Sequence, residues 1–156
     1  MKVLIVYDSV SKEKMTEKVA GLVRDGLKEG GVEVDSFFVK DAGSVKVEDY
    51  DCLIVGTPTM AWKPTDETKK FLGGLEGKQL SGKMASCFDT QMRSFISGNA
   101  NKAMSEKLAA LGFKLVGAPL QSYVAGGKEG YHFKEAGEAD KAKAWGKDLA
   151  AAVAKK

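Results

Sequence analysis

The sequence is poor in the residues that usually carry catalytic or metal chemistry. Its 156 residues include one histidine and two cysteines. His132 has no cysteine or carboxylate assigned beside it, so no catalytic role is predicted for it. Cys52 and Cys87 lie inside the apolar runs "DCLIVG" and "MASCFDT", without the spacing of a metal site or a disulfide framework. We expect two buried free thiols in a reducing compartment, and no metal.

Long apolar runs and dense charge clusters are also missing. No apolar run approaches the ~20 residues of a membrane span. The opening "MKVLIVYDSV" leads straight into a loop and a helical pattern, with no small-residue cleavage site, so it predicts a strand rather than a signal peptide. The net charge is +3; residues 1–75 carry 11 basic and 13 acidic side chains, and residues 76–156 carry 13 and 8. This mild basic bias lacks the Lys/Arg clusters of nucleic-acid binders. We expect a cytoplasmic globular protein that binds neither membrane nor nucleic acid.

Strand and helix patterns alternate along the whole chain. Apolar runs without polar alternation predict strands covered on both faces, and apolar groups three and four residues apart predict helices. The predicted strands are 2–7, 32–39, 51–56, 83–90 and 113–127; the predicted helices are 15–29, 65–76, 100–111 and one from about 138, with a short helical turn within 40–50. This alternation predicts an α/β protein: a parallel sheet in a three-layer α/β/α sandwich. Without a repeat or linker, residues 1–156 are expected to form a single domain.

The loops after the strands are where a ligand is expected. Sheets of this kind bind ligands beyond the carboxyl ends of their strands. Those loops are residues 8–14, 56–64, 89–99 and 123–137. The loop "GTPTMAWKP" carries Trp62 where solvent is expected, and an indole there packs either on a flat ligand ring or on a neighbouring helix.

Several short segments resemble one known family. They are "LIVYDS", "TEKVA", "LIVGTPTMAWKP", "FDT" and "KAWGKDLA", of which the third is the most specific. Across essentially its whole length the chain resembles flavodoxin-type proteins. The resemblance implies a five-stranded parallel sheet of order 2-1-3-4-5, noncovalently bound FMN, and transfer of electrons between redox enzymes.

The resemblance also implies which residues contact FMN. Those implied for the phosphate are Ser9, Val10, Ser11 and Thr16. Those implied for one side of the isoalloxazine ring are Pro58, Thr59, Met60, Ala61 and Trp62, with Trp62 stacking on it. Those implied for the pyrimidine edge or the ribityl chain are Asp89, Thr90 and Gln91, and Phe95 would flank the other face of the ring.

The first loop departs from the family pattern. Flavodoxins usually have a hydroxyl-rich turn ending in Gly-Asn-Thr, whereas this chain has "SVSKEKMTEK", without glycine. Glycine suits such a loop because backbone must approach the phosphate closely or adopt positive φ. Either the loop still wraps the phosphate, with Lys12 or Lys14 supplying direct charge, or residues 11–14 begin the helix early and FMN binding is weakened or lost. The lysines could equally form a solvated face with Glu13 and Glu17.

Three functions follow from these alternatives. The first is an FMN-binding carrier of electrons between redox partner proteins, which requires no acid–base residue of its own. The second is a flavodoxin-fold interaction or regulatory module that has lost FMN. The third is an FMN-dependent quinone-type reductase, for which no nicotinamide pocket is identified. The first is favoured, so the chain is expected to be a carrier rather than a catalyst with its own substrate. Flavodoxins that donate electrons to basic partners are typically strongly acidic, so a net charge of +3 suggests an acidic partner or a different role.

Overall fold

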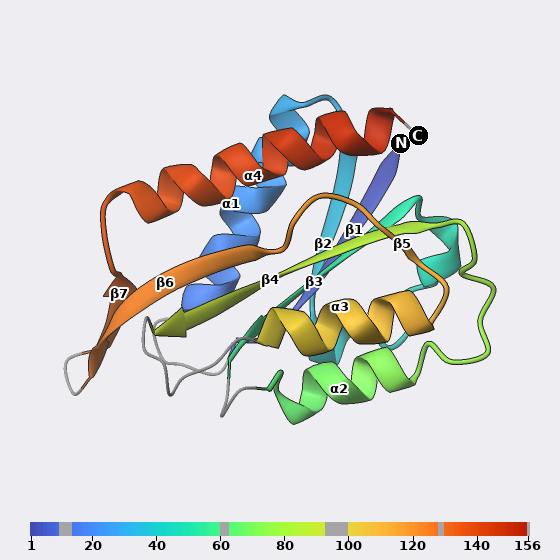
Figure 1. The fold of residues 1–156 in the computed structure, drawn as a ribbon, viewed down its shortest axis with the longest axis horizontal. Helices are drawn as coiled ribbons and strands as arrows, with labels where there is room; N and C mark the ends of the chain where they lie inside the picture. The colour runs from blue at the N-terminus through green and yellow to red at the C-terminus, as the bar shows by residue number, and fades with distance from the viewer. Residues whose placement is uncertain (10–13, 60–62, 93–99, 128–129, 156) are drawn as a thin grey trace.

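A mostly parallel sheet with helices on both faces forms the centre of the computed structural model (Figure 1), which describes residues 1–9, 14–59, 63–92, 100–127 and 130–155. The strands are β1 Lys2–Tyr7, β2 Glu33–Phe38, β3 Cys52–Pro58, β4 Met84–Met92, β5 Lys114–Leu115, β6 Leu120–Gly127 and β7 Gly130–Phe133. The α-helices are α1 Met15–Glu29, α2 Asp66–Gly73, α3 Ala100–Ala110 and α4 Gly137–Ala154. Short 3-10 turns cover Val39–Asp41 and Val47–Asp49.

The predicted three-layer α/β/α architecture is confirmed. The sheet order is β2-β1-β3-β4-β6-β7, with β5 also paired to β4. The central strands β1, β3 and β4 pair in parallel, and β2 is parallel to β1. Helices α1 and α4 cover one face, and α2 and α3 cover the other (Figure 1).

The fifth strand, predicted over 113–127, is divided into two strands. Residues 114–115 pair with the start of β4 as β5, and residues 120–124 pair with its end as β6. Gly117 lies between them with φ of 67°, in the left-handed region that favours glycine. Pro119 has no backbone N–H to give to a ladder. The left-handed backbone of Gly117 and the missing N–H of Pro119 therefore interrupt the strand between β5 and β6.

The predicted loop over 123–137 is also corrected. Residues up to 127 continue β6, and Gly130–Phe133 form β7, which is antiparallel to β6. Within the described residues the sheet therefore has seven strands where five were predicted, and a short hairpin lies at its edge. "GYHF" lacks the apolar run that marked the other strands, so the sequence did not indicate it.

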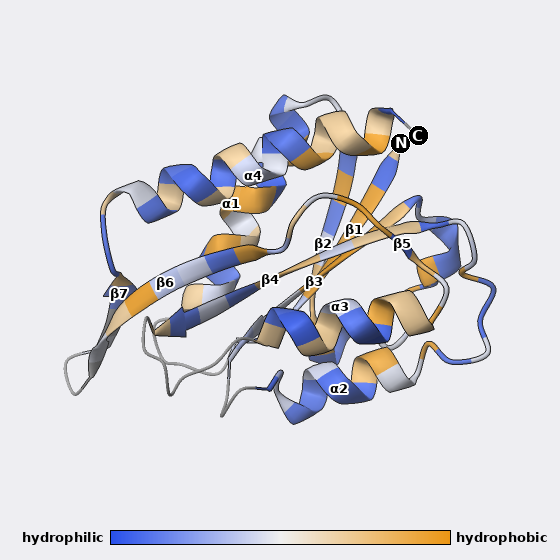
Figure 2. Ribbon diagram, viewed as in Figure 1, coloured by the Kyte–Doolittle hydropathy of each residue, from blue (hydrophilic) through white to orange (hydrophobic). Residues whose placement is uncertain are grey.

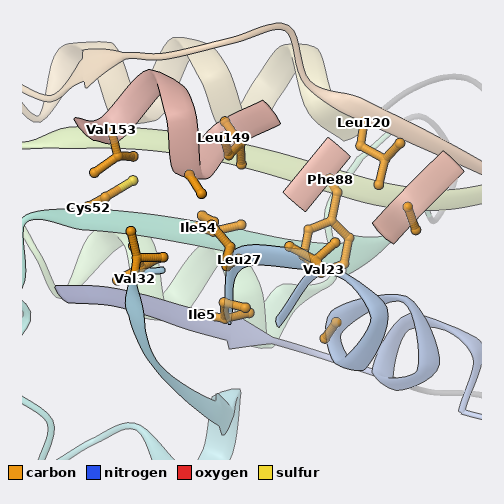
Figure 3. Packing of buried hydrophobic residues seen from close by; sticks show 14 of the residues in the cluster. Ile5, Val23, Leu27, Val32, Cys52, Ile54, Phe88, Leu120, Leu149 and Val153 are labelled. Carbon is orange, nitrogen blue, oxygen red and sulfur yellow. The ribbon is translucent and has the colours of Figure 1, made fainter. Parts of the chain in front are cut away.

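Two apolar cores lie on the two faces of the sheet. Alternate side chains of β1 and β3 enter each: Ile5 and Ile54 face α1 and α4, whereas Leu4 and Leu53 face α2 and α3. Orange colouring is therefore concentrated on β1 and β3, while the helices carry mixed colours (Figure 2). Phe88 fills the first core beside Leu120 (Figure 3). Both cysteines are buried and free, as predicted.

Glycines bring α1 and α4 close together. A Cβ atom on Gly26 would lie 2.1 Å from the carbonyl oxygen of Lys143, and one on Gly146 would lie 2.4 Å from that of Val23. The two helices can approach this closely only because both positions lack a side chain. Glu29 joins the same pair of helices through ion pairs with Lys143 and Lys147, at 3.1 and 3.4 Å. Among the described helices, none is long and apolar enough to cross a membrane.

Candidate functional site at the carboxyl edge of the sheet

The carboxyl ends of β1, β3 and β4 lie at one edge of the sheet, because these strands are parallel and in register. Tyr7 pairs with Gly56, and Pro58 pairs with Thr90. The loops predicted to bind a ligand therefore begin side by side. The amino ends of α1, α2 and α3 face the same edge, since each helix follows one of these strands.

Helix α1 begins at Met15 and not earlier. The residue before it, Lys14, has φ 51° and ψ 51°, which is the left-handed conformation. Among the described residues it is the only non-glycine with positive φ. The alternative in which residues 11–14 begin the helix early is therefore wrong at Lys14. This lysine takes the backbone geometry that glycine would supply, and a left-handed residue before a helix start turns successive N–H groups toward one point.

Ser9 carries a buried hydroxyl beside this helix start. Its Oγ has no hydrogen-bond partner within the described part of the chain. Its backbone N–H donates to the Asp8 carboxylate at 2.8 Å. Buried hydroxyls normally have a partner, so this one is free to accept or donate a further hydrogen bond. Ser9 and Lys14 also line a cavity of about 390 Å³ next to β2.

Asp8 links the first loop to the start of α2. Its carboxylate accepts a 2.6 Å hydrogen bond from the Thr65 hydroxyl, although 57 residues separate the two. Thr65 is the N-cap of α2, and its Oγ accepts from the backbone N–H of Thr68. Thr57, which is fully buried at the end of β3, bonds to both threonines. This network joins the end of β1, the end of β3 and α2.

Sequence reasoning did not identify this network as part of the site. Asp8, Thr57, Thr65 and Thr68 were not among the predicted site residues. A usable signal was present: a carboxylate follows directly on a buried strand at Asp8. Polar groups at that position face the ligand edge of such sheets.

Asp89 makes a second polar cluster, at the end of β4. The side chain is fully buried, and its carboxylate accepts from the Thr59 hydroxyl at 2.7 Å and from the Gln91 amide at 2.8 and 2.9 Å. The first backbone N–H of α3, from Ala100, also donates to it at 3.2 Å. Burial raises the pKa of the Asp89 carboxyl above its usual value, and the hydrogen bonds from Gln91, Thr59 and Ala100 oppose that shift.

The hydroxyls of Thr16 and Thr90 meet in the interior at 2.8 Å. Thr16 is 2% exposed and Thr90 is 5% exposed. The structure therefore brings together a residue predicted for the phosphate and one predicted for the flavin edge. It turns both hydroxyls toward each other.

The other predicted site residues fall into two groups. Pro58 and Thr59 lie at the end of β3, where the backbone N–H of Thr59 donates to the Thr90 carbonyl at 3.0 Å. The predictions for Val10, Ser11, Lys12, Met60, Ala61, Trp62 and Phe95 lie outside the described residues.

Tyr7 adds an aromatic surface beside the first loop. Its hydroxyl donates to Glu17 at 3.0 Å, and its ring lies 6.0 Å from that of Phe38. Burial, together with the hydrogen bond to Glu17, raises the pKa of Tyr7 to about 12. Glu17 lies in the first turn of α1, where a carboxylate interacts favourably with the helix dipole.

This arrangement of strands, helices and polar clusters is that of a flavodoxin-like fold. A flavodoxin from the domain Archaea superposes with a TM-score of 0.78 at 20% identity, covering 99% of each chain. Rubredoxin oxygen:oxidoreductase from Desulfovibrio gigas gives 0.81 at 22% identity, covering 99% of this chain and 36% of that one. At such identities the likeness concerns the fold alone.

The sequence comparisons supply the family. The family model described as flavodoxin matches residues 5–152, so the chain belongs to the flavodoxin family, as its sequence predicted. A flavodoxin of Clostridium saccharobutylicum is 32% identical over 91 residues, and probable flavodoxin 2 of Bacillus subtilis (strain 168) is 36% identical over 91 residues. These alignments cover 58% and 56% of this chain. The chain spans 56% and 58% of those two relatives, little more than half of their length.

Proposed function

We propose that this chain binds FMN noncovalently and carries electrons from one redox protein to another. The observation that carries the proposal is the left-handed Lys14 ahead of α1, beside the hydroxyl of Ser9, which has no partner among the described residues. Together they support a phosphate site at the start of α1 even though the loop lacks glycine. The match to the flavodoxin family over residues 5–152 supports the same conclusion.

The phosphate would be held by the start of α1. The first N–H groups of a helix have no intrahelical acceptor, and the helix dipole favours an anion there. We assign this role to the backbone N–H groups of Met15 and Thr16, since the Thr16 hydroxyl is already bonded to Thr90. The hydroxyl of Ser9 and the charge of Lys14 would add side-chain contacts, with Val10, Ser11 and Lys12 completing the loop.

The isoalloxazine ring would lie against the loop that follows β3. Pro58 and Thr59 fix where that loop leaves the sheet, Met60, Ala61 and Trp62 would cover one side of the ring, and Phe95 the other. Thr90 and Gln91 would contribute backbone groups near the pyrimidine edge. Bound FMN supplies the one- and two-electron chemistry, and the protein supplies binding, orientation and electrostatics.

The remaining features fit a carrier. A carrier needs no acid–base pair of its own, and the described site offers carboxylates that are already held by hydroxyls and amides. Its net charge of +3 suits encounters with acidic redox proteins, because opposite charges steer association. We further propose that residues 1–156 act as one domain in the cytoplasm.

A titration of the flavin-free protein with FMN, run in parallel with riboflavin, tests the proposal. Quenching of flavin fluorescence reports binding. We expect saturable binding of FMN that is tighter than binding of riboflavin, since only FMN carries the phosphate. Equal affinity for both would show that residues 9–16 do not hold a phosphate. Absence of binding for either flavin would overturn the proposal.

A further inference from the structure

Three elements converge on the buried carboxylate of Asp89. Thr59 comes from the loop after β3, Gln91 from β4 itself, and Ala100 from the first turn of α3. The backbone N–H of Ala100 also donates to the Thr59 hydroxyl at 3.0 Å, so Thr59, Asp89 and Ala100 form a closed triangle of hydrogen bonds. The carboxylate is 0% exposed. In this structure its oxygens accept from protein donors and are closed to solvent.

The residues held by Asp89 flank the two loops assigned to the flavin ring. Thr59 is the last described residue before Met60, Ala61 and Trp62, and Ala100 is the first described residue after the loop that contains Phe95. Both loops are therefore fixed at one end to the same carboxylate. Hydrogen bonds to a charged group are stronger than bonds between neutral groups, so this attachment is rigid.

We propose that Asp89 is a positioning residue for FMN: it fixes the two ring-flanking loops relative to each other without contacting the cofactor. This inference rests on the proposed function. It changes the role of Asp89 from the cofactor contact implied by sequence to a support beneath the site. The Asp89 carboxylate lies in a buried region, where charge acts over a longer range than in water.

Two substitutions separate geometry from charge. Asp89→Asn removes the charge and forces an amide N–H against donors from Gln91 and Ala100. Thr59→Val removes one hydrogen bond of the triangle and keeps the charge. Ser9→Ala is the matched control on the phosphate side, since its hydroxyl has no partner within the described residues and its loss should leave the fold intact. For each variant we would measure the affinity for FMN and for riboflavin, and the midpoint potential of bound FMN. Thermal unfolding of the flavin-free variant reports its stability.

Because Asp89 supports the ring loops and not the phosphate loop, Asp89→Asn and Thr59→Val should weaken FMN and riboflavin binding by the same factor, about tenfold or more. Ser9→Ala should weaken FMN alone. Asp89→Asn should also shift the midpoint potential to a more positive value, since a buried negative charge opposes the addition of electrons, whereas Thr59→Val should leave the potential near that of the wild type.

Each result is decisive. Unchanged riboflavin affinity in both ring-side variants would overturn the positioning role, even if thermal stability fell. If Asp89→Asn does not fold, Thr59→Val alone decides the matter through its riboflavin affinity. If the unsubstituted protein binds neither flavin, the proposed function fails and this inference fails with it. Binding by the unsubstituted protein with no effect of either substitution removes the inference alone.

Discussion

The hydroxyls of Thr16 and Thr90 lie 2.8 Å apart in the protein interior, although 74 residues separate them in the sequence. One belongs to the first turn of α1 and the other to the end of β4. Their hydrogen bond holds the start of α1 against the end of β4. The helix start proposed to hold the phosphate is thus anchored to the strand that carries Asp89.

Breaking this pair should reveal coupling between its two members. Thr16→Val leaves the Thr90 hydroxyl buried without its partner, and we expect a loss of about 1–3 kcal/mol in the free energy of unfolding. Thr90→Val should behave in the same way. The double variant should lose less than the two single losses together, since no hydroxyl is then left unpaired. Urea denaturation of all three checks this, and strictly additive losses would contradict it.

Lys14 should be strained by its left-handed backbone. A non-glycine residue in this conformation costs about 1–2 kcal/mol, so Lys14→Gly should unfold at higher urea concentration than Lys14→Ala. Both variants lose the lysine charge. If that charge contributes to phosphate binding, FMN affinity should fall in both while riboflavin affinity stays constant. Equal stability of the glycine and alanine variants would contradict the strain.

The close crossing of α1 and α4 should not tolerate a side chain. In Gly26→Ala the new Cβ would lie 2.1 Å from the carbonyl oxygen of Lys143, and the helices would have to separate. We expect a loss of about 1–3 kcal/mol in the free energy of unfolding. Gly21→Ala in the same helix is the control: its Cβ meets nothing within 4 Å, so it should gain up to about 1 kcal/mol from helix propensity. Equal changes in the free energy of unfolding for the two substitutions would show that the close contact at Gly26 does not determine stability.

Alkaline conditions should destabilise the fold through its thiols. Burial raises the pKa of Cys52 to about 12 and that of Cys87 to about 11, from 9.0 for a free thiol. Above pH 9 the unfolded chain loses these protons while the native chain keeps them, so the unfolded state binds fewer protons and stability falls as the pH rises. Tyr7 and Tyr50, whose pKa is raised from 10.0 to about 12, act in the same direction at higher pH.

Urea denaturation between about pH 8 and about pH 10.5 measures this slope. Cys52→Ala should show a shallower decline than the wild type, since one of the titrating thiols is gone. Identical slopes in the two proteins would rule out a thiol contribution.

Helix α1 shows how far the sequence alone could determine this structure. The sequence predicts a helix over 15–29 because apolar residues recur at helical spacing up to Gly30-Gly31, and both are local signals. The structure has the helix at Met15–Glu29. The fifth strand shows the limit of such signals. "FKLVGAPLQSYVAGG" contains enough strand-forming residues for one strand, but pairing with two separate parts of β4 divides it at Gly117 and Pro119.

The site divides in the same way. The sequence indicated which loops meet, because parallel strands all end at one edge, and the motifs after the first, third and fourth of the predicted strands named the family. It did not show that Lys14 takes the place of glycine, since φ depends on how the loop is held at both ends. Nor did it show that Asp89 is enclosed, or that Asp8 bonds Thr65 from 57 residues away. Local pattern predicts most of the elements, whereas β7 and the hydrogen bonds between residues distant in sequence exist only once the elements are packed together.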